Sequence, residues 1–334
     1  MRTAIYGAGS LGTVLGAYLT KAGMQVDLIS RNRAHIEALR KHGARIVGKQ
    51  ELTVPVNALH YENMEGTYDY ILLLTKQLEN DKVSSFLAPF LGETGVLCTL
   101  QNGLPEPALM EKLGPGRVCG CTIGWGATLL EPGMVELTSE TDALSFNLGM
   151  LPPVNHAMLT KLSDLLSIMG PVTIEENFLG ARWSKLLINA SFSGIATVLG
   201  CTFGEVVDNR QARRLAQQIM KECLDTAKTG GVVLQPVQGK DIARLFDFHG
   251  PVKRLISFSL IPLAMKKHRA LKPSMLQDLE KGKPCEVDAI NGVLSSQARK
   301  VGVPTPVNDQ VVSLIHAIEQ KQKSVGWQNL DAFS

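Results

Sequence analysis

The stretch of sequence that decides the fold stands close to the start of the chain, where residues 3–12 read TAIYGAGSLG. A short apolar run is followed by glycines in the spacing Gly-x-Gly-x-x-Gly and by a helical pattern over residues 11–22. Gly7 permits a tight turn, Gly9 lets the backbone approach a bound group, and Gly12 lets helix and strand pack closely. The N-terminus of such a helix attracts phosphate through its free N–H groups and its dipole. We therefore expect a dinucleotide to bind along this turn, with a purely structural glycine turn as the alternative; the residues concerned are Gly7, Ala8, Gly9, Ser10, Leu11 and Gly12.

Short apolar runs alternate with helical patterns through the first half of the chain. The predicted strands cover residues 3–6, 25–29, 70–74, 95–100 and 118–122, and the predicted helices between the first of them cover 11–22 and 33–41. Strands separated by helices need crossover connections, so the pattern predicts a doubly wound parallel sheet, a Rossmann domain. Further strands are predicted at 124–130 and 133–137, around the turn signal Glu131-Pro132-Gly133, and at 143–148 and 171–174. We expect residues 124–148 to form an antiparallel extension of the same sheet.

The second half of the chain has mainly helical patterns, over residues 180–199, 209–229, 252–263, 285–301 and 308–321. The sequence therefore predicts an α/β domain over residues 1–176, which would bind the cofactor, and an all-α domain over residues 177–334, which would bind the substrate. The apolar helices of residues 180–229 fit either the core of a monomer or the interface of a homodimer, and both stay open.

Composition narrows the class of protein. The 334 residues are 45% hydrophobic and 19% charged, with a formal net charge of +3, which excludes a disordered chain and argues against nucleic acid as a partner. The apolar runs are far shorter than the roughly 20 residues that span a bilayer, and the first residues lack the pattern of a signal peptide, so neither feature is expected. The six cysteines form no Cys-x-x-Cys pair and no Cys/His cluster, so we expect reduced thiols and no metal site. A soluble, cytoplasmic protein without a membrane partner is expected.

The residues after the second predicted strand bear on the choice of cofactor. Ser30-Arg31-Asn32-Arg33 puts no carboxylate at the strand tip, where NAD enzymes tend to bind the ribose hydroxyl. Arg31 can pair with a 2′-phosphate and stack on adenine, and Arg33 can assist it. Asp27 is the rival ligand, for NAD, but it lies inside the strand, and a solvated loop charge is the alternative role for Arg31. NADP(H) is the expected cofactor.

Two polar residues follow later strands of the predicted sheet. Lys76 comes after the strand that ends near Leu74, and Asn102 comes after the strand that ends at Leu100. Ligands of open α/β sheets bind outside the carboxyl ends of the strands. Lys76 can therefore reach a nucleotide or a substrate, and Asn102 offers a donor and an acceptor near a nicotinamide. Each also fits an ordinary polar loop residue.

A polar stripe crosses the apolar helix predicted over residues 180–199. Lys185, Asn189 and Ser193 recur at i, i+4 and i+8, so they share one face of the helix. A lysine seldom occupies such surroundings without a partner or a purpose. The alternative is that these three residues form the one face of the helix that solvent reaches.

A second polar segment lies at residues 283–292, and residues 274–278 precede it. Pro284 suits the start of a helix, and acidic residues suit its first turn. Glu286 and Asp288 therefore have helix capping as an alternative to a role in binding.

Taken together, these segments resemble the ketopantoate reductase (2-dehydropantoate 2-reductase) family along nearly the whole chain. The resemblance rests on the glycine motif with Arg31, Lys76 and Asn102-Gly103, then on Trp183-Ser184-Lys185-x-x-x-Asn189, Ser274-Met275-x-x-Asp278 and Glu286-x-Asp288-x-x-Asn291-Gly292. The last three motifs, in that order, are far more specific than the glycine fingerprint. They imply NADPH-dependent reduction of ketopantoate, a small anionic 2-oxo acid, to pantoate, a step toward pantothenate and coenzyme A.

The resemblance also implies roles for individual residues. Lys185 is the expected general acid, and Glu286 is expected to orient the substrate and to couple to that lysine. The implied substrate contacts are Asn102, Asn189, Ser193 and Ser274, the last of them to the substrate carboxylate. The implied cofactor contacts beyond the glycine turn are Arg31, Lys76, Asn102 and Glu286.

One departure from the family pattern concerns the substrate. Family members often carry a second asparagine where this chain has Ser193, and serine is shorter and offers fewer hydrogen bonds. Another branched 2-oxo acid therefore remains an alternative substrate. A non-catalytic NADP-binding protein is a further alternative, although it should lack Lys185 or Glu286. β-Hydroxyacid dehydrogenases share the two-domain plan, but the Lys-x-x-x-Asn spacing and the Glu286 segment favour ketopantoate reductases. Residues 232–271 cannot be matched to the family residue by residue.

Overall fold

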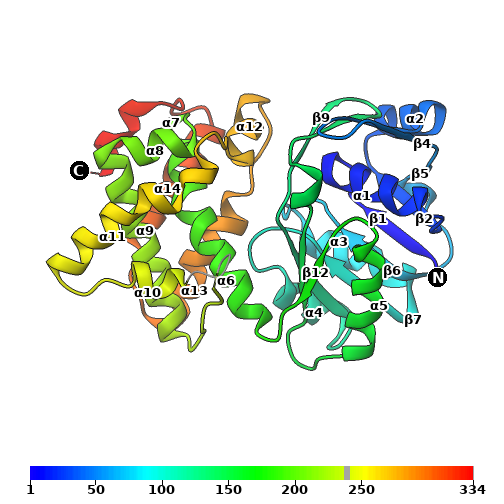
Figure 1. The fold of residues 1–334 in the computed structure, drawn as a ribbon, viewed down its shortest axis with the longest axis horizontal. Coiled ribbons are helices and arrows are strands. Elements are labelled where there is room, and N and C mark those ends of the chain that lie inside the picture. The colour runs from blue at the N-terminus through cyan, green and yellow to red at the C-terminus, as the bar shows by residue number, and fades with distance from the viewer. Residues whose placement is uncertain (237–240, 334) are drawn as a thin grey trace. The chain divides into compact units, whose positions relative to one another are not determined.

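The computed structural model describes residues 1–236 and 241–333, which fall into two compact units (Figure 1). The sheet unit comprises Met1–Gln101 and Pro105–Phe178. The helical unit comprises Asn102–Leu104 and the chain from Leu179 onwards. Each unit has its own hydrophobic core and is described separately below.

The main sheet of the first unit has eight strands. Their order across the sheet is β12 (Val172–Ile174), β11 (Phe146–Gly149), β8 (Val118–Ile123), β7 (Leu91–Thr99), β6 (Tyr68–Leu73), β1 (Thr3–Tyr6), β2 (Val26–Ser30) and β5 (Asn57–His60). Neighbouring strands run parallel except β8 and β11, which pair antiparallel. From β1 the chain moves outward to β2 and β5 and then returns to β6 on the other side of β1. The crevice of a doubly wound sheet lies at such a reversal, so it falls here between β1 and β6. The predicted Rossmann fold is confirmed.

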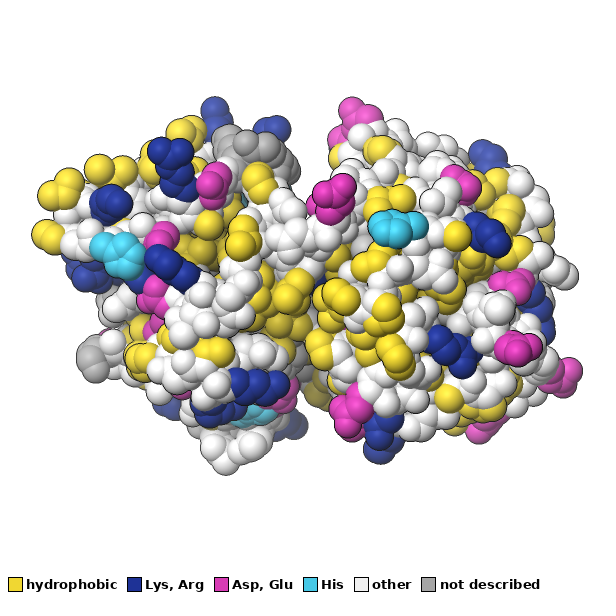
Figure 2. Space-filling model, turned by 90° about the horizontal axis from the view of Figure 1, so that it is seen from below, with side chains coloured by type: hydrophobic (Ala, Val, Ile, Leu, Met, Phe, Trp, Pro, Cys, Tyr) yellow, Lys and Arg dark blue, Asp and Glu magenta, His cyan; other side chains and the backbone are white. Residues whose placement is uncertain are grey.

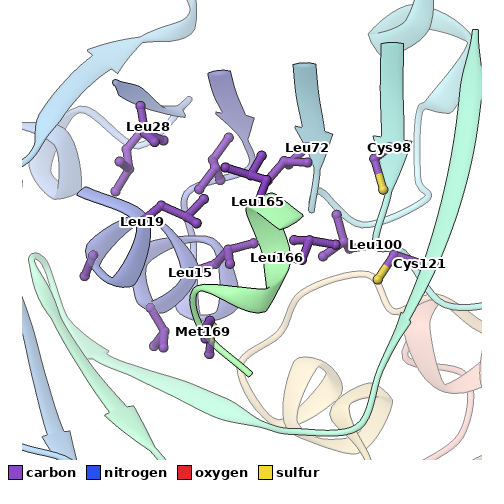
Figure 3. Packing of buried hydrophobic residues seen from close by; sticks show 14 of the residues in the cluster. Leu15, Leu19, Leu28, Leu72, Cys98, Leu100, Cys121, Leu165, Leu166 and Met169 are labelled. Atoms are coloured by element: carbon purple, nitrogen blue, oxygen red, sulfur yellow. The ribbon is translucent and has the colours of Figure 1, made fainter. Parts of the chain in front are cut away.

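Helices cover both faces of this sheet because its strands are apolar on both sides. In β1, Ile5 faces one cluster of buried residues, while Ala4 and Tyr6 face another. The helices on the Ile5 side are α1 (Ser10–Lys21), α2 (Arg33–His42) and α5 (His156–Ser167), and those on the opposite side are α3 (Asn80–Leu87) and α4 (Glu106–Leu113). Figure 3 shows α1 and α5 meeting over the strands through Leu15, Leu19, Leu165 and Leu166.

The hairpin around Gly133 does not extend the main sheet, so that part of the prediction is wrong. β9 (Ala127–Glu131) and β10 (Met134–Leu137) belong to a separate four-stranded sheet, in the order β4 (Leu52–Val54), β3 (Ala44–Gly48), β10, β9. β10 pairs parallel with β3, and the strands of this sheet contact α1. The turn is held there because Gly133 N donates to Nδ1 of the buried His35 at 3.0 Å. Only β11, paired antiparallel with β8, provides the predicted antiparallel extension.

The helical unit surrounds one apolar core. Its elements are α6 (Phe178–Ile188, whose first residue closes the sheet unit), a π-helical turn (Asn189–Ser193), α7 (Gly194–Leu199), α8 (Phe203–Asp208), α9 (Arg210–Thr229), α10 (Ile242–Phe246), α11 (Pro251–Ala264), α12 (Ser274–Glu280), a second π-helical turn (Asp288–Gly292), α13 (Val293–Val301) and α14 (Pro306–Glu319). Short 3-10 helices lie at Tyr61–Asn63, Ala88–Phe90, Thr141–Ala143, Lys266–His268 and Trp327–Phe333. From α6 to α9 the buried apolar side chains form the core of this unit. Residues 180–229 therefore fit the first of the two alternatives, a core within one chain, rather than a homodimer interface. Among the described residues, no helix is both long and apolar enough to cross a membrane.

One helix of this unit, α11, exposes several apolar side chains, although it buries Ile261 in the core. Val252, Leu255 and Leu263 of α11 are 65–71% exposed, and Ile256 is also exposed. At this spacing they form a stripe along one side of the helix. Figure 2 shows hydrophobic and basic side chains together at the end of the helical unit where Figure 1 places α11.

Candidate active site

The glycine turn joins β1 to α1 and is held tightly from below. Gly7 N and Ala8 N both donate to Ile29 O, at 3.0 and 2.9 Å, so the turn is tied to β2. Gly7 has φ +107°, and a Cβ there would lie 2.5 Å from Thr75 N. The turn therefore also abuts the segment that follows β6, and Gly7 cannot carry a side chain.

The other two glycines show why one side of the turn is closed and the other open. A Cβ on Gly12 would lie 2.5 Å from Gly7 O, so α1 packs directly on the turn. A Cβ on Gly9 would meet nothing within 4 Å. Gly9 is also the N-cap of α1 and provides no side-chain cap to its first N–H groups. An open backbone at a helix N-terminus fits a pyrophosphate, and a side chain on Gly9 would fill that space.

Arg31 lies just beyond β2 and already has an acidic partner. Its Nη1 is 3.0 Å from Glu79 Oε2, and its guanidinium lies 5.6 Å from the ring centre of Tyr61. Lys82 Nζ also binds Glu79, at 2.7 Å, and hydrogen bonds from Lys82 and Arg31 lower the pKa of the Glu79 carboxyl. Sequence analysis missed Glu79, because nothing near it indicates a contact with a residue 48 positions earlier. Arg33, the proposed helper, instead pairs with Glu62 at 2.6 Å.

Asp27 is committed to the scaffold. It lies near the amino end of β2, opposite Ala4, and is only 5% exposed. Its carboxylate accepts hydrogen bonds from Arg2 Nη2 at 2.9 Å, the Tyr68 hydroxyl at 2.8 Å and Asn57 Nδ2 at 2.6 Å. With these three donors at the amino end of its strand, Asp27 is in no position to bind a ribose at the carboxyl end.

The loop that carries Lys76 is held by a buried glutamine that sequence analysis did not assign. Gln101, 4% exposed, donates from Nε2 to Thr75 O and to Asn80 Oδ1, both at 2.8 Å. Its Oε1 accepts from Thr99 Oγ1 at 2.9 Å and from Asn80 Nδ2 at 3.0 Å. Gln101 thereby joins the ends of β6 and β7 to the start of α3. Lys76 is partly exposed in the loop that this network holds.

Asn102 follows Gln101 directly but clusters with the helical unit, together with Gly103 and Leu104. Leu104 packs against the core of that unit, and Gly103 has φ +74°. Asn102 itself is partly exposed. The chain therefore enters the helical unit briefly at this point and returns to the sheet unit at Pro105.

Lys185 and Asn189 are partly exposed, whereas Ser184, Leu186 and Ala190 beside them are buried. The helix is not α-helical throughout, because α6 ends at Ile188 and a π turn follows. In a regular α-helix residues i and i+8 are rotated about 80° apart. A π turn rotates the chain less per residue, so it reduces this drift and returns Ser193 toward the line of Lys185. Ser193 is 8% exposed.

The two acids of the last motif occupy different environments. Glu286 is 8% exposed and stands just before the second π turn, where its carbonyl oxygen accepts from Ile290 N at 3.1 Å. Asp288 is exposed and pairs with His316 Nε2 at 3.0 Å, and the turn that it begins has no side-chain cap hydrogen bond. Ser274 is exposed at the first residue of α12.

The segments that carry these residues contact one another inside the helical unit. The second π turn, which follows Glu286, touches the first, which carries Asn189 and Ser193. α12, which begins at Ser274, packs against α7. Residues some 90 positions apart in sequence thus come from neighbouring elements of one unit.

Both units match models of one known protein family. A family model described as ketopantoate reductase PanE/ApbA matches residues 3–151, and a model of the C-terminal part of the same family matches residues 177–319. A 2-dehydropantoate 2-reductase of Pyrococcus horikoshii is 30% identical over 321 residues, covering 96% of this chain and 98% of that protein.

Two solved structures show the same fold. D-mandelate dehydrogenase in a ternary complex with NADH and anilino(oxo)acetate superposes with a TM-score of 0.82 at 26% identity, covering 96% of this chain and 99% of that one. A ketopantoate reductase of Staphylococcus aureus, described as dimeric, superposes with a TM-score of 0.75 at 20% identity, covering 97% and 100%.

Proposed function

Because the chain belongs to the ketopantoate reductase family, a family of oxidoreductases, we propose that it catalyses the NADPH-dependent reduction of ketopantoate to pantoate. The observation that carries the proposal is the partly exposed Lys185 between the buried Ser184 and Leu186 of α6, within the unit that also holds the buried Glu286. Placing a lysine among buried residues costs free energy, and a catalytic role would explain why the helix carries one.

The chain's own residues provide the proton and the orientation for this reaction. The open backbone at Gly9 and the uncapped start of α1 would hold the cofactor pyrophosphate. The nicotinamide cofactor, when bound, would supply the hydride that the carbonyl carbon of the 2-oxo acid needs. The Lys185 ammonium stabilises the negative charge on the carbonyl oxygen and then donates the proton that completes the hydroxyl group. Ser274 would bind the substrate carboxylate, and Asn102, Asn189 and Ser193 would bind its polar groups.

NADPH is proposed over NADH on the strength of Arg31. A guanidinium matches the geometry of a 2′-phosphate, and Asp27, the one candidate for an NAD-type contact in β2, is bonded to the scaffold. The D-mandelate dehydrogenase structure holds NADH, so NADH is the alternative to test. The kcat/KM for each cofactor, measured at one saturating concentration of 2-oxo acid, distinguishes them. A preference for NADH would refute this part of the proposal.

A second candidate substrate is favoured by the same neighbour. D-mandelate dehydrogenase was solved with an oxo acid analogue that carries an aromatic group, and Ser193 leaves more room than asparagine would. The test is to measure kcat/KM for ketopantoate, for 2-oxoisovalerate, which lacks the hydroxyl group, and for the 2-oxo acid that corresponds to mandelate. A site that binds the hydroxyl of ketopantoate should discriminate strongly against both, because its polar groups would otherwise stay unpaired. A higher kcat/KM for either analogue than for ketopantoate would show that ketopantoate is not the preferred substrate.

The role of Lys185 is tested by Lys185→Ala, with Lys300→Ala on the exposed last turn of α13 as the matched control. Loss of the general acid should lower kcat by about 100-fold or more while the affinity for NADPH stays unchanged. Lys300→Ala should behave as the wild type. Turnover by Lys185→Ala within a few-fold of wild type would remove Lys185 from the mechanism. If the wild type binds NADPH but oxidises it with none of the 2-oxo acids, the non-catalytic alternative is correct.

For the assembly we propose a homodimer that buries the apolar stripe of α11. Monomeric proteins seldom expose several large apolar side chains in one stripe, and the S. aureus relative is described as dimeric. Sedimentation equilibrium of the wild type should give twice the chain mass, and Leu255→Lys should give a monomer. A wild-type protein that is monomeric at micromolar concentration would exclude this assembly.

A further inference from the structure

The helical unit contains two π-helical turns that lie against each other. The first, Asn189–Ser193, carries two residues of the polar stripe that begins at Lys185. The second, Asp288–Gly292, begins two residues after Glu286. π turns are rare and occur frequently at functional sites, and here each adjoins residues proposed to bind the substrate.

Asn291 of the second turn is the link between them. Its side chain is completely buried, and its Nδ2 donates to Ala190 O, inside the first turn, at 3.0 Å. The same Nδ2 donates to Asn308 Oδ1 at 2.8 Å, and Asn308 Nδ2 donates back to Asn291 O at 2.9 Å. Both acceptors of Asn291 Nδ2 are oxygens, and Asn308 is itself oriented by its own bonds. The direction of the Asn291 amide is therefore fixed.

The approach of this amide to the first turn leaves no spare room. A Cβ on Gly194, the residue that follows the first turn, would lie 2.9 Å from both Nδ2 and Oδ1 of Asn291. The Oδ1 atom is buried without a hydrogen-bond partner among the described residues. A buried acceptor that stays unpaired costs free energy, and the two bonds that Nδ2 donates hold the amide here in spite of that cost.

We propose that Asn291 is a positioning residue for substrate binding, because it holds the first π turn in register through Ala190 O. That turn sets the direction of Asn189 and Ser193 relative to Lys185, since a regular α-helix would rotate Ser193 about 80° away from the lysine. The described hydrogen bonds of the Asn291 amide go to Ala190 O and Asn308 Oδ1 and not to these side chains. The inference rests on the proposed function in one respect, that the stripe binds the 2-oxo acid.

The chain offers a matched control in Asn329. This asparagine is also buried, at 4% exposed, and its Nδ2 donates to a carbonyl of α7, Val198 O at 3.1 Å. It also donates to Ser324 O at 2.9 Å. Asn329 therefore makes the same kind of bond to the same helix, but beyond the π turn. Asn291→Leu and Asn329→Leu remove equivalent donors, and only the first should disturb the stripe.

The kinetic arm compares these two variants with the wild type. Asn291→Leu should raise KM for the 2-oxo acid about tenfold or more and lower kcat, while KM for NADPH stays within about twofold. Asn329→Leu should lower the melting temperature without changing KM for the 2-oxo acid. Equal KM values in the two variants would show that Asn291 is merely structural. Should Asn291→Leu fail to fold, Asn308→Ala removes the partner that orients Asn291 and should raise the same KM to a smaller extent; an unchanged KM there would equally overturn the proposal.

The second arm does not depend on activity. Amide hydrogen exchange over residues 190–196 should speed up at least about tenfold in Asn291→Leu and stay near the wild-type rate in Asn329→Leu. Equal protection of this segment in both variants would overturn the positioning role. If the wild type reduces none of the 2-oxo acids tested, the proposed function fails, but this exchange experiment still decides whether Asn291 holds the π turn.

Discussion

Glu222 of α9 is expected to make the helical unit less stable as the pH rises toward 7. Its carboxylate is 9% exposed and accepts hydrogen bonds from Val307 N and Asn308 N, both at 3.0 Å, at the start of α14. Burial raises the pKa of this carboxyl from 4.5 to about 7, although the two N–H donors oppose the shift. The folded state therefore holds the proton over a range of pH in which the unfolded chain has already released it.

The sign and size of the effect follow from proton linkage. Between pH 4.5 and 7 the unfolded chain binds fewer protons than the folded protein, so the free energy of unfolding falls as the pH rises. The stabilisation is complete below the unfolded pKa and is lost once the pH passes the folded pKa. A difference of 2.5 pKa units (about 7 minus 4.5) corresponds to about 3 kcal/mol.

Urea unfolding of the wild type and of Glu222→Gln at a series of pH values measures this term. A Trp125→Phe background makes tryptophan fluorescence report the helical unit, where Trp183 and Trp327 lie. The glutamine amide does not titrate, so the variant lacks this pH dependence. The free energy of unfolding of the wild type, minus that of Glu222→Gln, should therefore fall by about 3 kcal/mol from pH 4.5 to pH 8. Glu205→Gln should show the opposite trend, because hydrogen bonds from Thr202 lower the pKa of the Glu205 carboxyl. A difference for Glu222 that is flat, or that rises with pH, would refute the reasoning.

Three further predictions concern the cofactor half of the site. Gly9→Ala should leave the melting temperature near that of the wild type, because the added Cβ meets no protein atom. The same Cβ fills the open side of the turn, so NADPH binding should weaken at least tenfold in a fluorescence titration. Gly12→Ala should lower both the melting temperature and the affinity for NADPH, because its Cβ would lie 2.5 Å from Gly7 O. Glu79→Gln should lower KM for NADPH about two- to fivefold and leave KM for NADH unchanged, because it removes a carboxylate 3.0 Å from Arg31, and solvent screens the attraction of such an exposed pair. Gln101→Leu should lower the free energy of unfolding by about 1–3 kcal/mol and raise KM for NADPH, because it unties the Lys76 loop and leaves buried polar partners unpaired; unchanged KM with the stability loss would confine Gln101 to a structural role.

Several features of this protein follow from local sequence. The strands that the sequence predicted and the glycine turn at residues 7–12 are set by side-chain periodicity and by backbone freedom, which act over a few residues. The short strands β3, β4 and β5 were not predicted. The polar stripe from Lys185 is visible for the same reason, because four-residue spacing along a helix needs no knowledge of other elements. The family resemblance then joined these local signals into a proposed reaction.

Other features depend on residues that lie far apart in the chain, and only the tertiary structure decided them. The hairpin around Gly133 has the alternation of any antiparallel pair, but its sheet is chosen by an available edge at β3 and by a hydrogen bond to His35, 98 positions earlier. Glu79 beside Arg31 has no local signal either. The π turn that begins at Asn189, and the bond from Asn291 to Ala190 O, 101 positions apart, cannot be seen in a pattern that predicts one continuous helix. Local propensity determines which elements form, whereas partner choice depends on which surfaces and unpaired polar groups the packed chain brings together.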